Sequence, residues 1–134
     1  MIDPWSHRRS VNGFTFGLGP AGYDVRVANG RTVLPGQFAL TSTLESFIMP
    51  DDLLAQVCDK SSWARRGLAV QNTIIEPGWR GYLTLELTNH GHHPIYLRAG
   101  TPIAQIIFMQ LDQPTDMPYS GKYQDQEPGP QGPR

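Results

Sequence analysis

The sequence has a single cysteine, almost no charge imbalance and no long apolar run, and each absence excludes a class of protein. Cys58 alone cannot form an internal disulfide or a multi-cysteine metal site. No apolar run approaches the ~20 residues of a membrane-spanning helix. The N-terminal MIDPWSHRRS lacks the apolar core of a secretory signal. The formal net charge of −1 argues against a general nucleic-acid binder. We therefore expect one cytoplasmic domain with neither a membrane nor a nucleic-acid partner.

Helical periodicity is nearly absent, and short alternating runs separated by turns take its place. In YLTLELTN, the expected strand has Leu83, Leu85 and Leu87 on one face and polar residues, including Thr84 and Glu86, on the other. Other strands are expected at 23–27, 37–42, 94–98 and 103–111. One short helix is expected within SSWARRG. The pattern predicts an all-β sandwich, jelly roll or barrel rather than a parallel α/β sheet.

The two ends of the chain differ in composition from its middle. Residues 1–20 have few periodic apolar positions, so we expect an irregular N-terminal segment before a β domain at 21–113. Residues 114–134 have the polar composition of a flexible C-terminal arm. A frayed terminus is the simplest interpretation of this arm. Its aromatic, cationic and amide side chains would also suit it to cover a nucleotide, through Tyr119, Lys122, Tyr123 and Gln126.

Three acidic residues are candidates for chemistry, and each has a structural alternative. Glu86 lies in a strand pattern, where a glutamate most often faces solvent. Inside a cleft, the same carboxylate could take a proton from water and deliver it to a substrate nitrogen. Glu76 precedes the Pro77-Gly78 turn and could be a strand-end residue, an acceptor for a sugar hydroxyl, or a base. Asp24 is more simply structural, although it could orient a loop or hold a hydrated cation.

The stretch KSSWARRG, residues 60–67, groups basic and hydroxyl side chains ahead of a glycine. Its spacing fits either a phosphate-binding loop or a solvated turn. The cluster of His90, His92 and His93 is more simply an exposed hairpin tip than a metal site. The zinc deaminase signature H-x-E…P-C-x-x-C is absent, as are a Walker A loop and a G-x-S-x-G elbow. We predict no metal site on the protein itself.

Four blocks follow one another along the chain: KSSWARRGL, IEPGWRGYLTLELTN, AGTPIAQIIF and PYSGKYQDQ. Together they resemble the dCTP deaminase branch of the dUTPase-like family. The preceding GPAGYDVRV resembles the first dUTPase motif as much as the corresponding deaminase segment, and TSTLESFIMPDDL resembles the family's strand that enters the phosphate loop. The resemblance implies a dUTPase-like distorted jelly roll, or β-clip barrel, with one short helix and a flexible C-terminal arm. It also implies a homotrimer with sites between subunits and a role in cytoplasmic pyrimidine nucleotide metabolism.

The resemblance further implies hydrolytic deamination of dCTP to dUTP and ammonia, with no metal bound by the protein. Glu86 would act as general acid and base, while Arg65 and Ser61 would help to place the water. Mg²⁺ is expected only as a companion of the nucleotide triphosphate. The residues expected to bind substrate are Lys60, Ser62, Glu76, Thr84, Tyr119, Lys122 and Gln126.

Departures from the family pattern keep other functions open. The hairpin at 68–75 is about two residues shorter than in the deaminase pattern, so Gln71, Asn72 and Thr73 are expected to meet the base with polar groups. A modified cytosine nucleotide is therefore also a candidate substrate. Glu76 stands where dUTPases have the aspartate that activates water. The alternatives are a dUTP diphosphatase, a bifunctional deaminase and diphosphatase, and a non-catalytic nucleotide-binding regulator.

Overall fold

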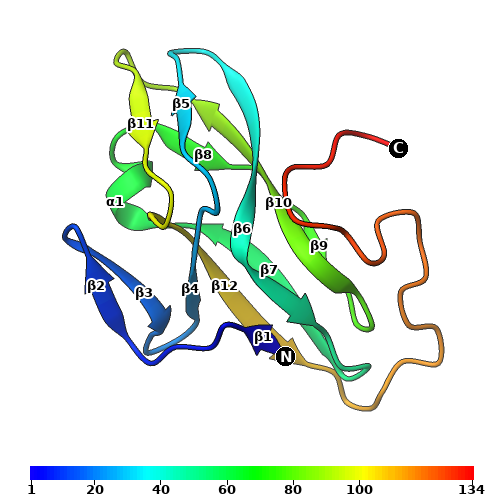
Figure 1. Cartoon of the computed structure of the whole chain (residues 1–134). Coiled ribbons are helices and arrows are strands. Elements are labelled where there is room, and N and C mark those ends of the chain that lie inside the picture. The colour runs from blue at the N-terminus through cyan, green and yellow to red at the C-terminus, as the bar shows by residue number, and fades with distance from the viewer.

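The computed structural model describes residues 1–134, which form twelve strands, one short helix and a long C-terminal tail (Figure 1). The first strands are β1 (Ile2–Asp3), β2 (Arg9–Val11), β3 (Phe14–Leu18) and β4 (Tyr23–Arg26). The middle of the chain forms β5 (Arg31–Val33), β6 (Phe38–Ile48), β7 (Leu53–Asp59) and α1 (Ser61–Ala64). The remaining strands are β8 (Leu68–Val70), β9 (Ile74–Ile75), β10 (Arg80–Asn89), β11 (Ile95–Leu97) and β12 (Pro102–Gln110).

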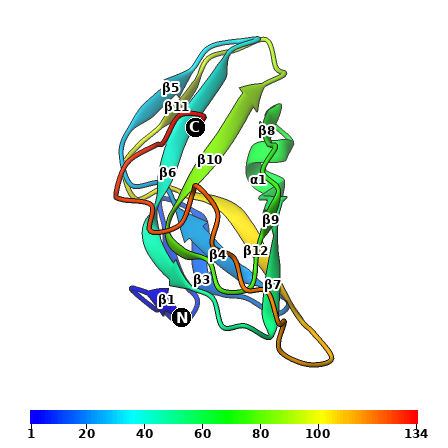
Figure 2. The ribbon, with the colours of Figure 1, turned by 90° about the vertical axis from the view of Figure 1, so that its right-hand side faces the viewer.

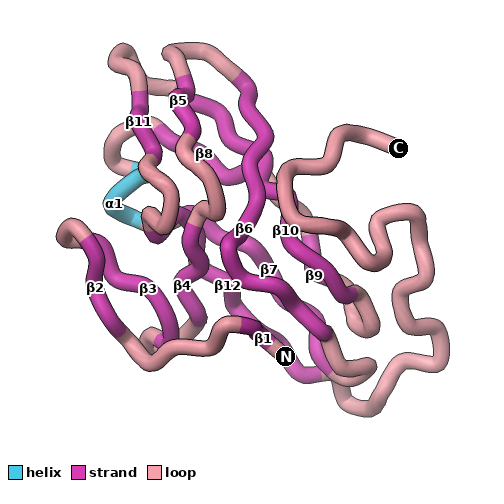
Figure 3. The backbone as a smooth tube through the Cα atoms, viewed as in Figure 1, coloured by secondary structure: helices cyan, strands magenta, loops and turns pink.

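The strands form two larger sheets and one separate pair. The first sheet has the order β1-β6-β10-β8, the second has the order β2-β3-β4-β12-β7-β9, and β5 pairs with β11. All of these pairs are antiparallel. Figure 3 shows how little of the backbone is helical. The predicted all-β class with one short helix is therefore confirmed. No helix is long and apolar enough to cross a lipid bilayer.

A single apolar core of 22 buried residues joins the two larger sheets. The alternation in β4 explains its contribution, because Tyr23 and Val25 are buried while Asp24 between them is only half-buried. From the other sheet, Leu85 and Leu87 of β10 are fully buried. Burial of one large apolar side chain contributes about 1.5–3 kcal/mol. The core therefore holds β10 firmly by one of its faces.

The strands predicted from alternation are all present, as β4, β6, β10, β11 and β12. The helix predicted within SSWARRG is α1, and Pro50 is followed by the turn that leads into β7. β6 extends to Ile48, well beyond the stretch predicted for it. The short strands β5, β8 and β9 have too few residues for alternation to reveal them.

The N-terminal segment is more regular than expected. Residues 1–20, expected to be irregular, contain β1, β2 and β3. β2 and β3 form a hairpin whose turn residues, Asn12 and Gly13, have φ values of 51° and 82°. A type I′ hairpin turn requires positive φ at both central residues, and Asn-Gly is the pair that adopts it most readily. The NG pair is thus a hairpin signal in this sequence.

The C-terminal arm, residues 114–134, contains no strand but lies along the first half of β10 (Figures 1 and 2). The Asp125 N–H donates to the Arg80 carbonyl, and the Tyr82 N–H donates to the Gln126 carbonyl, each at 3.0 Å. Gly81 and Gln126 form an isolated parallel bridge. Figure 1 shows the end of the arm and α1 on opposite sides of the molecule. The arm therefore has a defined position on the β domain.

Candidate active site

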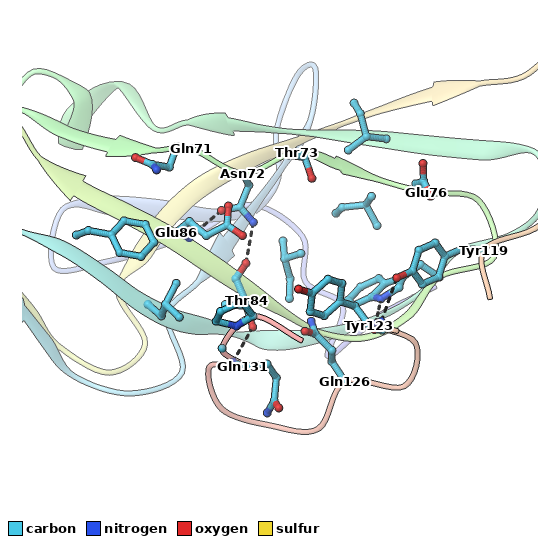
Figure 4. A pocket seen from close by; sticks show the side chains of 18 residues that line it. Gln71, Asn72, Thr73, Glu76, Thr84, Glu86, Tyr119, Tyr123, Gln126 and Gln131 are labelled. Carbon is cyan, nitrogen blue, oxygen red and sulfur yellow. Dashed lines mark hydrogen bonds between the residues drawn. The ribbon is translucent and has the colours of Figure 1, made fainter. Parts of the chain in front are cut away.

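A cavity of about 710 Å³ lies between β10, the 71–76 segment and the arm (Figure 4). Its volume is in the range of small-molecule sites. The walls combine aromatic and aliphatic surface with amide and hydroxyl groups. Glu76 and Glu86 are the only charged residues that line it, and Figure 4 shows them toward opposite ends. The cavity thus offers apolar surface for a flat ring and two separated carboxylates.

β10 places two of its polar residues, Thr84 and Glu86, in this cavity. Glu86 pairs with Leu40 of β6, and the pairing register shifts between Tyr82 and Thr84. Leu85 faces the core, whereas Thr84 and Glu86 line the cavity, as the alternation predicts. Leu83 departs from the prediction, because it is only half-buried and lines the cavity as well. The register shift explains this exception, since such an irregularity changes the direction in which side chains point.

Glu86 has the setting of a proton carrier. It is half-buried, and it forms hydrogen bonds only through its backbone, so its carboxylate has no partner within the chain. Desolvation by burial raises the pKa of this carboxyl above its ordinary value. A carboxylate that is desolvated but unpaired accepts a proton more readily than an exposed one. Of the candidate acids in the cavity, Glu86 is therefore the one suited to general acid–base chemistry.

The short hairpin after β8 lines the cavity with Gln71, Asn72 and Thr73. The Asn72 side chain donates from Nδ2 to the Thr84 carbonyl at 2.7 Å and accepts at Oδ1 from the Glu86 N–H at 2.8 Å. One N–H and one lone pair of its amide are therefore used by β10. The Gln71 Oε1 accepts from the Thr88 hydroxyl at 2.6 Å. Thr73 lines the cavity and is exposed.

The arm closes one side of the cavity with aromatic and amide side chains. Tyr119 and Gln126, both predicted from the sequence, line it together with Tyr123. The Tyr119 hydroxyl accepts from the Tyr123 N–H at 3.0 Å, and the Gln126 Nε2 donates to the Tyr82 carbonyl at 3.0 Å. Gln126 is thus a buried anchor of the arm as well as a wall of the cavity.

The last part of the arm reaches deeper than the sequence indicates. Gln131, Gly132 and Pro133 line the cavity, and the Gln131 N–H donates to the Thr84 hydroxyl at 3.0 Å. No sequence signal points to them, because GPQGPR has the composition of a free tail. Thr84, predicted to face the pyrimidine, is buried beneath this contact.

Two glycines permit the close approach of the arm. Gly81 has φ of 141°, and a Cβ there would lie 2.6 Å from the Gln126 backbone nitrogen. Gly78 has φ of 84°, and a Cβ there would lie 2.7 Å from the Pro118 Cβ. Only glycine combines these backbone angles with this lack of bulk. The glycines of PGWRG therefore permit both the turn before β10 and the close contact of the arm with β10.

The KSSWARRG stretch lies away from Glu86 within one chain. Lys60 and Ser61 line a second cavity of about 230 Å³, together with Arg8 and Asp24. The Lys60 ammonium forms a 2.7 Å ion pair with Asp24 and also donates to the Thr15 hydroxyl at 3.0 Å. The Lys60 side chain is thus bound within its own chain.

The remaining predicted residues are scattered. Ser62 and Arg65 are exposed on and just after α1 and line neither cavity. Lys122 is exposed, contacts Arg134 and lies outside the main cavity. Glu76 lines the cavity where β9 leads into β10. No three His, Cys, Asp or Glu side chains come close enough to hold a metal ion, and the histidine cluster is no exception.

Known structures with a similar backbone are dUTPases. The EIAV dUTPase matches with a TM-score of 0.66 and 24% identity, over 91% of this chain and 98% of that protein. The dUTPase of Staphylococcus bacteriophage 80alpha, solved with dUpNHpp, matches with a TM-score of 0.67 and 14% identity, over 90% of this chain and 88% of the phage protein. At these identities the likeness establishes the fold, and it confirms the predicted dUTPase-like jelly roll.

Sequence comparison separates the branches of this fold. The pattern of the dCTP deaminase-like family matches residues 23–111. The dCTP deaminase of Campylobacter fetus is 36% identical, over 95% of this chain and 86% of its own. The dCTP deaminase of Pyrococcus horikoshii is 36% identical, over 92% of this chain and 84% of its own. That of Thermococcus kodakarensis is 35% identical, over 92% of this chain and 92% of its own. The chain therefore belongs to the dCTP deaminase-like family, as its sequence blocks predict.

Proposed function

We propose that this protein catalyses the hydrolytic deamination of dCTP to dUTP and ammonia. The observation that carries the proposal is the unpaired, half-buried Glu86 carboxylate with its raised pKa, in the wall of a cavity of nucleotide size. Relatives covering nearly the whole chain are dCTP deaminases, which supports the same chemistry here. Action on a free nucleotide is consistent with a cytoplasmic location.

In the proposed reaction, a water oxygen forms a bond to C4 of the cytosine ring. Glu86 takes one proton from that water and passes it to N3. It then carries the proton of the new C4 hydroxyl to the 4-amino group, and the tetrahedral carbon expels this group as ammonia. One water is consumed, the C4–N bond breaks and a C4 carbonyl remains, so the product is dUTP. A carboxyl with a raised pKa suits both halves of this cycle, because it must accept and release a proton in each turnover.

Substrate binding in this proposal draws on the cavity walls and the arm. Thr84 would meet the pyrimidine, and Glu76 would accept a hydrogen bond from the deoxyribose 3′-hydroxyl. The phosphates would lie near Lys60, Ser62, Lys122 and Gln126. Because the Lys60 ammonium is paired with Asp24, it would have to turn away from that carboxylate to reach a phosphate directly. Mg²⁺ would arrive as part of the nucleotide substrate.

Completion of the site requires a second copy of the chain. Glu86 lines the main cavity, whereas Ser61 lines the second cavity and Arg65 is exposed near α1. A homotrimer with sites between subunits would bring Ser61 and Arg65 of one copy to Glu86 of the next. Large apolar side chains exposed beside the main cavity, such as Phe38 and Ile74, are surfaces that such an assembly could bury.

The alternative activity is dUTP diphosphatase, alone or following deamination. The observation in its favour is Glu76, which lines the same cavity and could activate water for attack on a phosphate. The fold neighbours are compatible with this alternative but do not favour it over deamination.

Incubation with dCTP and with dUTP, followed by separation of the products, tests the proposal. We expect equimolar ammonia and dUTP from dCTP and no reaction of dUTP. Formation of dUMP and pyrophosphate from dUTP would show a diphosphatase, and binding of both nucleotides without turnover would show a regulator. Either result without ammonia release would refute the proposed function.

A further inference from the structure

The edge of β10 that carries Glu86 loses its strand partner near this residue. β8 pairs with β10 only over Leu87 to Asn89, and Val70 is the last residue in that register. One further backbone bond follows, from the Gln71 N–H to the Glu86 carbonyl at 2.9 Å. The chain then leaves for β9, which pairs with β7 in the other sheet. Without another partner, the Glu86 N–H and the Thr84 carbonyl on this edge would be left unpaired.

The Asn72 side chain takes the place of the missing strand. A carboxamide has the same donor and acceptor as a peptide group. The Oδ1 accepts from the Glu86 N–H at 2.8 Å, and the Nδ2 donates to the Thr84 carbonyl at 2.7 Å. Figure 4 shows the side chain between these two residues, with a contact to each. Asn72 therefore extends the hydrogen-bond ladder by one rung where the backbone has already turned away.

This rung holds the backbone from which the Glu86 side chain extends. Both backbone polar groups of Glu86 are held by the hairpin, its carbonyl by Gln71 and its N–H by Asn72. Its carboxylate has no hydrogen-bond partner within the chain, so its position depends on its backbone and on packing. Thr84, the other end of the rung, also receives the Gln131 N–H from the arm. Asn72 thus ties the hairpin at 68–75 to the backbone of both Glu86 and Thr84.

We propose that Asn72 is a positioning residue for the reaction, whose carboxamide bridge between Glu86 and Thr84 holds the Glu86 carboxylate in the geometry needed for proton transfer. This inference rests on the proposed function and names a device within the same site. A displacement of about 1 Å in a reacting group can cost about 100-fold in rate. Without this rung, the Glu86 N–H and the Thr84 carbonyl on this edge of β10 would have no partner within the chain.

The test compares three variants by steady-state ammonia release from dCTP. Asn72→Ala removes both bonds, whereas Asn72→Asp keeps the acceptor for the Glu86 N–H but loses the donor for Thr84. Thr88→Val is the matched control, because it breaks the bond between Thr88 and Gln71 that ties the same hairpin to β10 without touching Glu86. We expect Asn72→Ala to lower kcat by about 10- to 100-fold with little change in KM. Thr88→Val should change kcat less than about threefold.

The pH profile separates positioning from a merely structural role. In Asn72→Ala, water gains access to Glu86, so its pKa and the acid limb of the kcat profile should move down. In Asn72→Asp, a second carboxylate lies beside Glu86, so the same limb should move up. Unchanged kcat and acid limb in folded Asn72→Ala would overturn the proposal. If Asn72→Ala fails to fold, Asn72→Asp decides, and an unshifted limb in that variant would overturn it equally.

A measurement without turnover keeps this inference distinct from the proposed function. The Glu86 carboxyl can be titrated by carbon-detected NMR in wild type and in both Asn72 variants. We expect the same opposite shifts of its pKa as in the rate profiles. If wild type releases no ammonia, the proposed function fails, and the titration alone then decides whether Asn72 controls the Glu86 carboxyl. Identical titrations in all three proteins would overturn the positioning role.

Discussion

Replacement of Glu86 by Gln removes the proton carrier while changing the shape of the side chain very little. General acid–base catalysis contributes about 10²- to 10⁴-fold in typical enzymes, which corresponds to about 2.7–5.4 kcal/mol of transition-state stabilisation. Because Glu86 would act first as base and then as acid, we expect Glu86→Gln to lower kcat by about 10³-fold or more. The KM for dCTP should stay within about tenfold, since the amide still fills the same space.

The same substitution should not weaken the fold at neutral pH. Burial raises the pKa of Glu86, so its ionised form is less favourable in the folded protein than in the unfolded chain. This penalty is absent below the unfolded pKa and complete above the folded pKa. A neutral glutamine avoids it. We therefore expect the thermal unfolding temperature of Glu86→Gln at pH 7 to equal or exceed that of wild type.

The assay is ammonia release at saturating dCTP, measured beside thermal unfolding of the same preparations. Glu76→Gln is the matched control, because it alters the other carboxylate of the same cavity. It should raise KM through the lost sugar contact and leave kcat within about tenfold. Near-normal turnover by folded Glu86→Gln would refute the reasoning. Loss of kcat in Glu76→Gln alone would assign the proton carrier to Glu76.

Three further predictions follow from the pKa and from the arm. The kcat of wild type should fall as pH decreases through the raised pKa of Glu86. The midpoint of this acid limb should therefore lie above the pKa of an exposed glutamate, and a midpoint at that ordinary pKa would show that the Glu86 carboxyl is not desolvated. Deletion of residues 119–134 should raise KM for dCTP sharply in initial-rate assays, whereas an unchanged KM would show a frayed end. Gly81→Ala should lower the free energy of unfolding by about 1–3 kcal/mol, because the added Cβ displaces Gln126, and denaturant titration measures this loss. The same displacement should raise the KM for dCTP, which initial-rate assays measure.

The fold and Glu86 could be predicted because local patterns encode them. Alternation over YLTLELTN places Leu85 in the core and Glu86 opposite, and this follows from strand geometry alone. The exception at Leu83 could not be foreseen, because a register shift depends on the partner strand β6. The Asn12-Gly13 hairpin was present in the sequence as a turn signal but lies where apolar alternation is weak.

The walls of the site were harder to predict because they depend on contacts distant in sequence. Asn72 forms hydrogen bonds with residues more than ten positions away. Composition does not indicate whether such an amide contacts a ligand or the protein backbone. Gln131 reaches Thr84 from a tail whose composition predicts disorder. Ser61 and Arg65 were grouped with Glu86 by resemblance, and a single chain leaves them apart. Their proposed association with Glu86 needs a second copy of the chain, and local sequence patterns do not indicate how copies would assemble.

The most direct measurement is a crystal structure of Glu86→Gln with dCTP bound. We expect a cytosine ring in the main cavity, with the substituted side chain of one copy within hydrogen-bond reach of a water molecule beside C4. We also expect the guanidinium of Arg65 from a second copy next to that water. A base held elsewhere, or Arg65 facing solvent in the assembled protein, would contradict the proposed reaction.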